Sequence, residues 1–153
     1  VESKTVAVNP PGAAPVLTHA QLWEGLLLKA EDPVAFVAGM EASRILGRRD
    51  DGLVREVVLR GRTFQEMITF TEPVQIRYDR IEGREIGFIM NTLSEGPGGL
   101  LLTYTIALAF PDAMPGTPEE EVEAARMGAK YAEAMEQTLA LIRKMAAEGR
   151  LKP

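Results

Sequence analysis

The side chains best placed to do chemistry in this sequence are Arg55 and Glu66. Two runs of alternating apolar residues, 53 to 60 and 63 to 71, flank Arg60-Gly61, a pair suited to a two-residue hairpin turn. Such a turn pairs residues whose numbers sum to about 121, so residue 55 faces residue 66. The rest of that face is apolar and consists of Leu53, Val57, Leu59, Phe64, Ile68 and Phe70. We therefore expect one arginine and one glutamate on an inward-facing, otherwise apolar surface.

Two interpretations of this pair stay open. Burying an ion pair costs desolvation that apolar residues avoid, so the pair is either a structural contact at the sheet margin or part of a site. In a catalytic site, Glu66 is the residue we expect to act as general base, with Arg55 or Tyr104 stabilising an enolate. Burial raises the pKa of a carboxyl group, but a nearby arginine lowers it, which argues against a base.

Further candidates lie on the last predicted strand and the last predicted helix. Tyr104 alternates with apolar residues, a pattern for which core packing is the more common reason and a hydroxyl directed inward the alternative. Helix methionines are ordinary core residues, but flexible thioethers also suit a pocket wall that adapts to varied apolar shapes. The predicted ligand-binding set is Arg55, Glu66, Tyr104, Met127, Tyr131 and Met135.

Composition excludes several classes of function. The chain has 153 residues, no cysteine and a single histidine, His19, which excludes thiolate and multi-histidine metal sites, and we expect no metal and no cofactor. A formal net charge of -5 with scattered basic residues argues against nucleic-acid binding. No apolar run approaches the ~20 residues of a membrane span, and no signal peptide is recognisable. We expect a cytoplasmic protein, either a monomer or a homodimer.

The elements that must position the candidates follow from periodicity and turn residues. We predict a strand over 4–9, a helix over 19–30 begun by a Thr18-Gln21 capping box, and a short second helix from Asp32 to Gly39. Turn residues at intervals of about ten then separate six antiparallel strands. These strands are predicted near 41–49, 53–60, 63–71, 74–81, 85–94 and 100–110. Residues 1–153 are expected to form one domain.

The last predicted helix runs from Thr117 to Glu148, with Thr117 as N-cap and Gly149 and Pro153 as stop signals. Its predicted buried face consists of Ala124, Met127, Gly128, Tyr131, Met135, Leu139, Ile142, Met145 and Ala146. The predicted exposed face consists of Glu123, Arg126, Lys130, Glu133, Arg143 and Lys144. At ~1.5 Å rise per residue this helix is roughly 45 Å long, so a large surface must lie along it.

The order of these elements resembles the helix-grip fold of the SRPBCC superfamily, which includes START and Bet v 1-like proteins. Several motifs are similar to its AtaL-like branch: Thr18-His19-Ala20-Gln21-Leu22-Trp23-Glu24-Gly25-Leu26 with Lys29-Ala30-Glu31-Asp32-Pro33, then Leu53-Val54-Arg55-Glu56-Val57, Gly61-Arg62, Glu66 and Asn91-Thr92. The resemblance implies an α+β fold in which a seven-stranded curved antiparallel sheet wraps around the long C-terminal helix, with two short helices after the first strand. It also implies an elongated, mostly apolar cavity between sheet and helix.

Two functions fit these observations. The first is binding of a small hydrophobic or amphipathic molecule, such as a lipid, an aromatic or a polyketide-like compound, in that cavity, and this is the function that we favour. The alternative is an enzyme of the polyketide cyclase or aromatase type that uses a cavity carboxylate. The resemblance implies no catalytic signature, because fold alone does not determine function.

Overall fold

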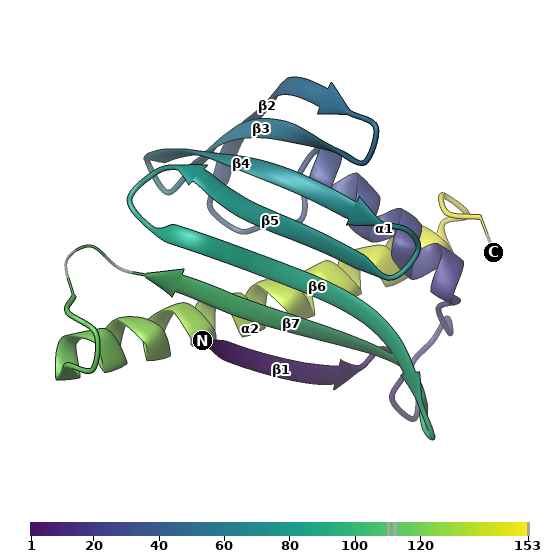
Figure 1. Cartoon of the computed structure of the whole chain (residues 1–153). Helices are drawn as coiled ribbons and strands as arrows, with labels where there is room; N and C mark the ends of the chain where they lie inside the picture. The colour runs from purple at the N-terminus through teal and green to yellow at the C-terminus, as the bar shows by residue number, and fades with distance from the viewer. Residues whose placement is uncertain (110, 112, 153) are drawn as a thin grey trace.

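A computed structural model describes residues 1–109, 111 and 113–152 and shows one curved antiparallel sheet with two helices on one of its faces (Figure 1). The strands are β1 (Glu2–Ala7), β2 (Met40–Arg49), β3 (Gly52–Leu59), β4 (Arg62–Thr71), β5 (Gln75–Glu82), β6 (Ile86–Gly96) and β7 (Gly99–Ala109). They lie in the order β1-β7-β6-β5-β4-β3-β2, so β2 to β7 form an uninterrupted meander and β1 pairs with the last strand. The helices are α1 (His19–Glu31) and α2 (Pro118–Ala147).

This architecture confirms the predicted α+β helix-grip fold, with strand boundaries within one or two residues of expectation. The prediction of a second short helix is wrong. Residues 32–39 form turns in which the backbone N–H groups of Phe36 and Val37 donate to the carbonyl oxygen of Pro33. One such turn is too short to propagate a helix before β2 begins at Met40. The predicted strand end at Phe110 and the stop signal at Pro153 lie outside the described residues.

The β3–β4 hairpin has the predicted register. Arg55 lies opposite Glu66, and Leu53 lies opposite Ile68. The turn residues Arg60 and Gly61 have φ angles of 48° and 78°, the left-handed conformation that a tight hairpin turn of this kind requires. The hairpin therefore places both charged side chains on the face of the sheet that the helices cover.

Helix α1 begins and packs as its sequence indicates. The Thr18 hydroxyl accepts a hydrogen bond from the Gln21 backbone N–H at 3.1 Å, and the Gln21 side chain accepts from the Thr18 N–H at 3.0 Å, which completes the capping box. Leu22 and Leu26 are buried in the core. Gly25 allows close contact with α2, because a Cβ at this position would lie 2.6 Å from the Ile142 side chain.

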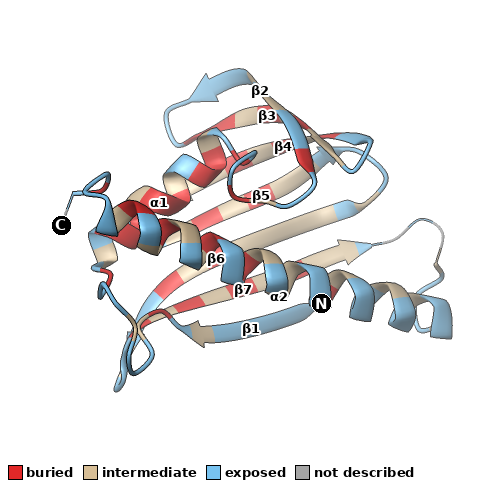
Figure 2. Ribbon diagram, turned by 180° about the vertical axis from the view of Figure 1, so that it is seen from behind, coloured by how far each residue is buried: buried red, intermediate tan, exposed pale blue. Residues whose placement is uncertain are grey.

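The burial of helix α2 differs between its two ends, as Figure 2 shows. Its C-terminal half carries the buried residues Met135, Thr138, Ile142 and Met145. Its N-terminal end extends beyond the sheet, so Ala124, which we predicted to be buried, is exposed. Arg143, predicted to be exposed, is half-buried, because its guanidinium donates to the carbonyl oxygens of Val8 and Pro15 in the loop after β1.

Candidate functional site

A cavity of about 380 Å³ lies between the sheet, the loop before β2 and the middle of α2, residues 126–137. This volume lies within the range of small-molecule sites in proteins. Its wall is apolar over a large part, through Val37, Ala38, Met40, Leu59, Phe64, Ile89, Leu108, Met127 and Ala134. The polar and charged groups come from α1, from β3 to β5 and from one side of α2.

Arg55 is held in the cavity wall by hydrogen bonds through all three of its guanidinium nitrogens. Its Nε and Nη2 donate to Glu66 Oε1 at 3.2 and 2.9 Å, and its Nη1 donates to the carbonyl oxygens of Lys29 and Ala30 at 3.2 and 2.9 Å. The last four carbonyl groups of a helix lack intrahelical partners, so Arg55 caps the C-terminal end of α1. Arg55 therefore joins α1 to the sheet, and its donors are largely used in doing so.

Glu66 lies between two arginines. Its second carboxylate oxygen, Oε2, is 3.9 Å from Nε of Arg80, and Arg80 also donates to Glu85 at 3.2 Å. The Arg80 guanidinium stacks on the Phe64 ring at 3.7 Å from its centroid, which fixes its position. The Glu66 carboxylate therefore balances the positive charges of Arg55 and Arg80 in the cavity wall. To abstract a proton from a ligand, it would have to give up these contacts.

Lys29 brings a third cation to the cavity wall, and its environment differs from that of the arginines. The side chain is 5% exposed, and Nζ lies 3.9 Å from the Met135 sulfur and 5.9 Å from the centroid of the Tyr131 ring. No carboxylate of the described residues forms an ion pair with it. Burial and, to a smaller extent, the Arg55 charge lower the pKa of the Lys29 amine to about 8, and the Glu66 carboxylate opposes part of this shift.

Two tyrosines line the same cavity. Burial raises the pKa of Tyr78 to about 12, and it also raises the pKa of Tyr131, so both phenols are neutral hydrogen-bonding groups at neutral pH. The Tyr131 hydroxyl accepts a hydrogen bond from the Asn91 side chain at 3.1 Å. The Tyr78 hydroxyl is buried and has no hydrogen-bond partner among the described residues.

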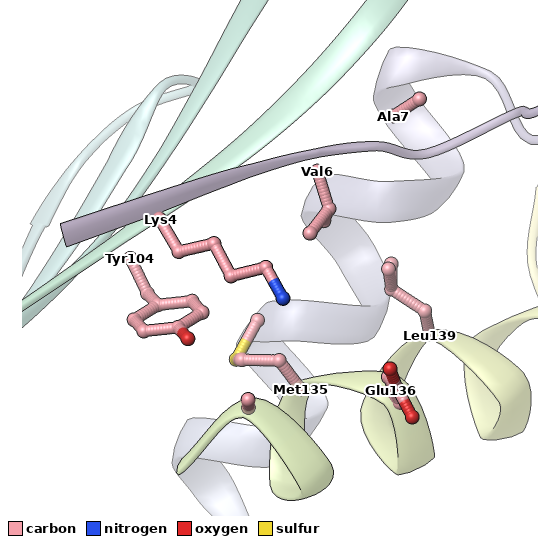
Figure 3. Close-up of a pocket in the computed structure, with 8 residues that line it drawn as sticks. Lys4, Val6, Ala7, Tyr104, Met135, Glu136 and Leu139 are labelled. Atoms are coloured by element: carbon pink, nitrogen blue, oxygen red, sulfur yellow. The ribbon is translucent and has the colours of Figure 1, made fainter. Parts of the chain in front are cut away.

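A second, smaller pocket of about 210 Å³ lies between β1 and α2, and Figure 3 shows the residues around it. Tyr104 and Met135 line this pocket together with Lys4 and Glu136. The Tyr104 and Tyr131 rings meet edge to face with centroids 4.8 Å apart. This contact lies between the two spaces, with Tyr131 lining the larger one and Tyr104 the smaller.

The structure thus brings together four of the six predicted site residues, Arg55, Glu66, Met127 and Tyr131, around the larger cavity. Tyr104 and Met135 line the smaller pocket instead. Two cavity residues that we missed had a sequence signal. Lys29 follows Leu22 and Leu26 at helical spacing, and Arg80 continues the alternation of Ile76 and Tyr78.

Among the described residues, no group of three or more histidines, cysteines, aspartates or glutamates is arranged to hold a metal ion. No helix in the described part of the chain is both long enough and apolar enough to cross a membrane.

Known structures with the same fold define the class of protein. The aromatase/cyclase ZhuI from Streptomyces sp. R1128 superposes with a TM-score of 0.68 at 16% identity, covering 95% of this chain and 94% of that one. A START superfamily protein from Mycobacterium smegmatis gives a TM-score of 0.63 at 18% identity, covering 92% and 97%. The di-domain aromatase/cyclase StfQ of the steffimycin biosynthetic pathway gives 0.71 at 13% identity, covering 95% of this chain and 52% of StfQ. The chain therefore has the same fold as these proteins, the helix-grip fold.

The model of the AtaL family, described as acetylaranotin biosynthesis cluster protein L, matches residues 3–149. The chain belongs to the AtaL family. The comparison with curated proteins gives no match.

Proposed function

We propose that this protein binds a small amphipathic molecule, mostly apolar, in the cavity between the sheet and α2. The observation that carries the proposal is the cavity itself: about 380 Å³ of space whose wall combines nine apolar residues with buried polar residues and with exposed charged ones. Binding sites for small molecules have this composition, since apolar surface supplies affinity and a few polar groups fix orientation.

The buried polar groups of that wall come from α1 and from β3 to β5. Arg55 and Glu66 are both 4% exposed, and the hydroxyl of Tyr78 and Nε of Arg80 are buried without hydrogen-bond partners among the described residues. Buried polar atoms without partners are costly, and a ligand that supplies hydrogen-bonding groups would satisfy them. We therefore expect the polar end of the ligand near β4 and β5 and its apolar part along α2.

A cyclase or aromatase activity with Glu66 as general base has less support. Glu66 Oε1 accepts two hydrogen bonds from Arg55, and Oε2 lies near Arg80. The similar aromatase/cyclase structures are under 20% identical, so they inform the fold and not the chemistry.

Binding is tested by titration with N-phenylnaphthylamine, a neutral apolar dye whose fluorescence rises in an apolar environment. Ala134 lines the cavity, so Ala134→Phe places a ring into the space and is expected to weaken dye binding by about tenfold or more. Ala140 is exposed on the same helix, so Ala140→Phe is the matched control and should bind as the wild type does.

Equal dye affinity in all three proteins would place the dye elsewhere and contradict the proposal. An absence of any dye signal, together with no thermal shift from a library of lipids and aromatic compounds, would also contradict it. Extraction of the protein from its native host followed by mass spectrometry is expected to recover an apolar species. A cytoplasmic location remains our proposal and is tested by fractionation of the host cells.

A further inference from the structure

We propose that the Lys29 ammonium group binds an ionised acidic group of the cavity ligand, such as a carboxylate or phenolate. This inference rests on the proposed function and specifies the class of ligand: an amphipathic anion. It assigns a recognition role to a residue whose helical position alone would suggest core packing.

The first argument is that Lys29 has no charged partner among the described residues. Lysine is almost never fully buried unless it is paired, yet the contacts of Nζ are a weak hydrogen bond to the Met135 sulfur at 3.9 Å and the face of the Tyr131 ring at 5.9 Å. The nearby carboxylate of Glu66 is already shared between Arg55 and Arg80. An ammonium group in this position has donors available for an incoming ligand.

The second argument is the charge of the cavity. Seven of the lining residues are lysine or arginine and three are glutamate, whereas the whole chain has a net charge of -5. The cations are Lys29, Arg55, Arg60, Arg62, Arg80, Arg126 and Lys130, and the glutamates are Glu66, Glu85 and Glu133. A positive cavity in an acidic protein favours anions over neutral or cationic molecules.

The third argument is that further hydrogen-bond donors line the same cavity as Lys29. Lys29 comes from α1, while Tyr78 and Arg80 come from β5, and all three line the same space. The Tyr78 hydroxyl and Arg80 Nε lack hydrogen-bond partners among the described residues. An oxyanion near Lys29 would add a charge-assisted hydrogen bond to a site that already offers further donors.

The pKa of Lys29 supports this role and makes ligand binding depend on pH. Three titratable or charged groups face the amine from the other elements: Arg55 on β3, Glu66 on β4 and Tyr131 on α2. In the free protein the pKa of Lys29 is about 8, and that of Tyr78 is about 12. A bound anion raises the pKa of Lys29, so binding at pH 8 takes up a proton.

The test compares naphthoate with naphthamide, two ligands of the same shape that differ in charge, by isothermal titration calorimetry. We expect naphthoate to bind the wild-type protein about tenfold more tightly at pH 7, the effect of one hydrogen bond to a charged group. Lys29→Met keeps an unbranched side chain that is one atom shorter, and it should remove this preference while leaving naphthamide affinity unchanged. Lys144→Met, at an exposed lysine on α2, is the matched control and should behave as the wild type.

A second measurement uses the wild-type protein alone. Naphthoate affinity should fall by about tenfold between pH 7 and pH 9, because the amine loses its proton around pH 8, and naphthamide affinity should stay constant. Equal affinities for the two ligands, or a pH-independent naphthoate affinity, would overturn the role of Lys29 while N-phenylnaphthylamine binding keeps the cavity proposal intact. Failure of all three compounds to bind would overturn both proposals.

Discussion

The two ends of the space between the sheet and α2 are built differently. At one end, Leu22 and Leu26 of α1 meet Ile142 and Met145 of α2, and all four are buried. At the other end, α2 passes over a cavity bordered by Met127 and by charged side chains. We call these regions the packed end and the cavity end.

The difference shows how one helix serves two purposes. Close packing at Gly25 and Ile142 fixes the C-terminal half of α2 against α1 and the sheet. The middle of α2, from Arg126 to Gln137, borders the cavity instead. The packed end should therefore carry most of the stability, and the cavity end should carry the ligand chemistry. Four substitutions test this division, in order of decreasing expected effect.

The largest effect is expected at the packed end. Ile142 is 0% exposed, and Ile142→Ala should lower the free energy of unfolding by about 4 kcal/mol through lost burial and a new void. Urea denaturation followed by circular dichroism measures this change. A loss below about 1 kcal/mol would show that the packed end is not the main source of stability.

The ion pair at the cavity end should come next. Glu66→Gln leaves the buried Arg55 without a counter-charge and leaves Arg80 with Glu85 alone, and breaking a buried ion pair costs about 3 to 4 kcal/mol. The change is measured by the same urea titration. The double substitution Glu66→Leu with Arg55→Met should recover part of the loss, since apolar replacement of a whole pair is often neutral. Full stability of Glu66→Gln would mean that the pair is not structural.

Lys29→Met should change stability in the opposite direction. Because the pKa of Lys29 falls from 10.5 to about 8 on folding, the unfolded chain holds the proton more tightly between these values. The charged amine therefore destabilises the wild type by up to about 3 kcal/mol below pH 8, and this cost disappears as the pH rises toward 10.5.

Thermal unfolding of both proteins checks this prediction. Lys29→Met should be the more stable protein at pH 7, and the difference should shrink between pH 8 and pH 10. A wild type that is more stable than the variant at pH 7 would indicate that Lys29 has a stabilising partner.

The smallest change is expected for Met127→Ala. Met127 is half-buried and borders the cavity, so its removal enlarges an existing space and costs about 1 kcal/mol or less. Its effect on binding of N-phenylnaphthylamine should exceed its effect on stability. A loss as large as that of Ile142→Ala would erase the distinction between the two ends.

The strands and the hairpin register followed directly from the sequence. Alternation in β3 and β4 and the Arg60-Gly61 turn leave only one pairing that buries Val57 and Ile68 on the same face. The capping box of α1 could also be predicted from the sequence, because it depends only on two residues that are three positions apart. Such local signals also placed Arg55 and Glu66 on the inward face.

These local signals did not predict which residues line the cavity. Helical periodicity puts Met127, Tyr131 and Met135 on one face, but it does not say where α2 lies along the sheet or where the rings of Tyr131 and Tyr104 come into contact. That contact assigns Tyr104 and Met135 to the smaller pocket. Long-range packing of this kind depends on the positions of both partners, which no single segment encodes.

The most direct test of a ligand cavity at one end of α2 is an NMR titration of methionine methyl groups with N-phenylnaphthylamine. The chain has seven methionines, and Met40 and Met127 line the cavity, whereas Met145 lies in the packed end and Met114 is exposed on the surface. We predict that the Met40 and Met127 signals shift together and saturate while those of Met145 and Met114 stay in place. Shifts confined to Met114, or equal shifts at all methionines, would contradict a binding site in this cavity.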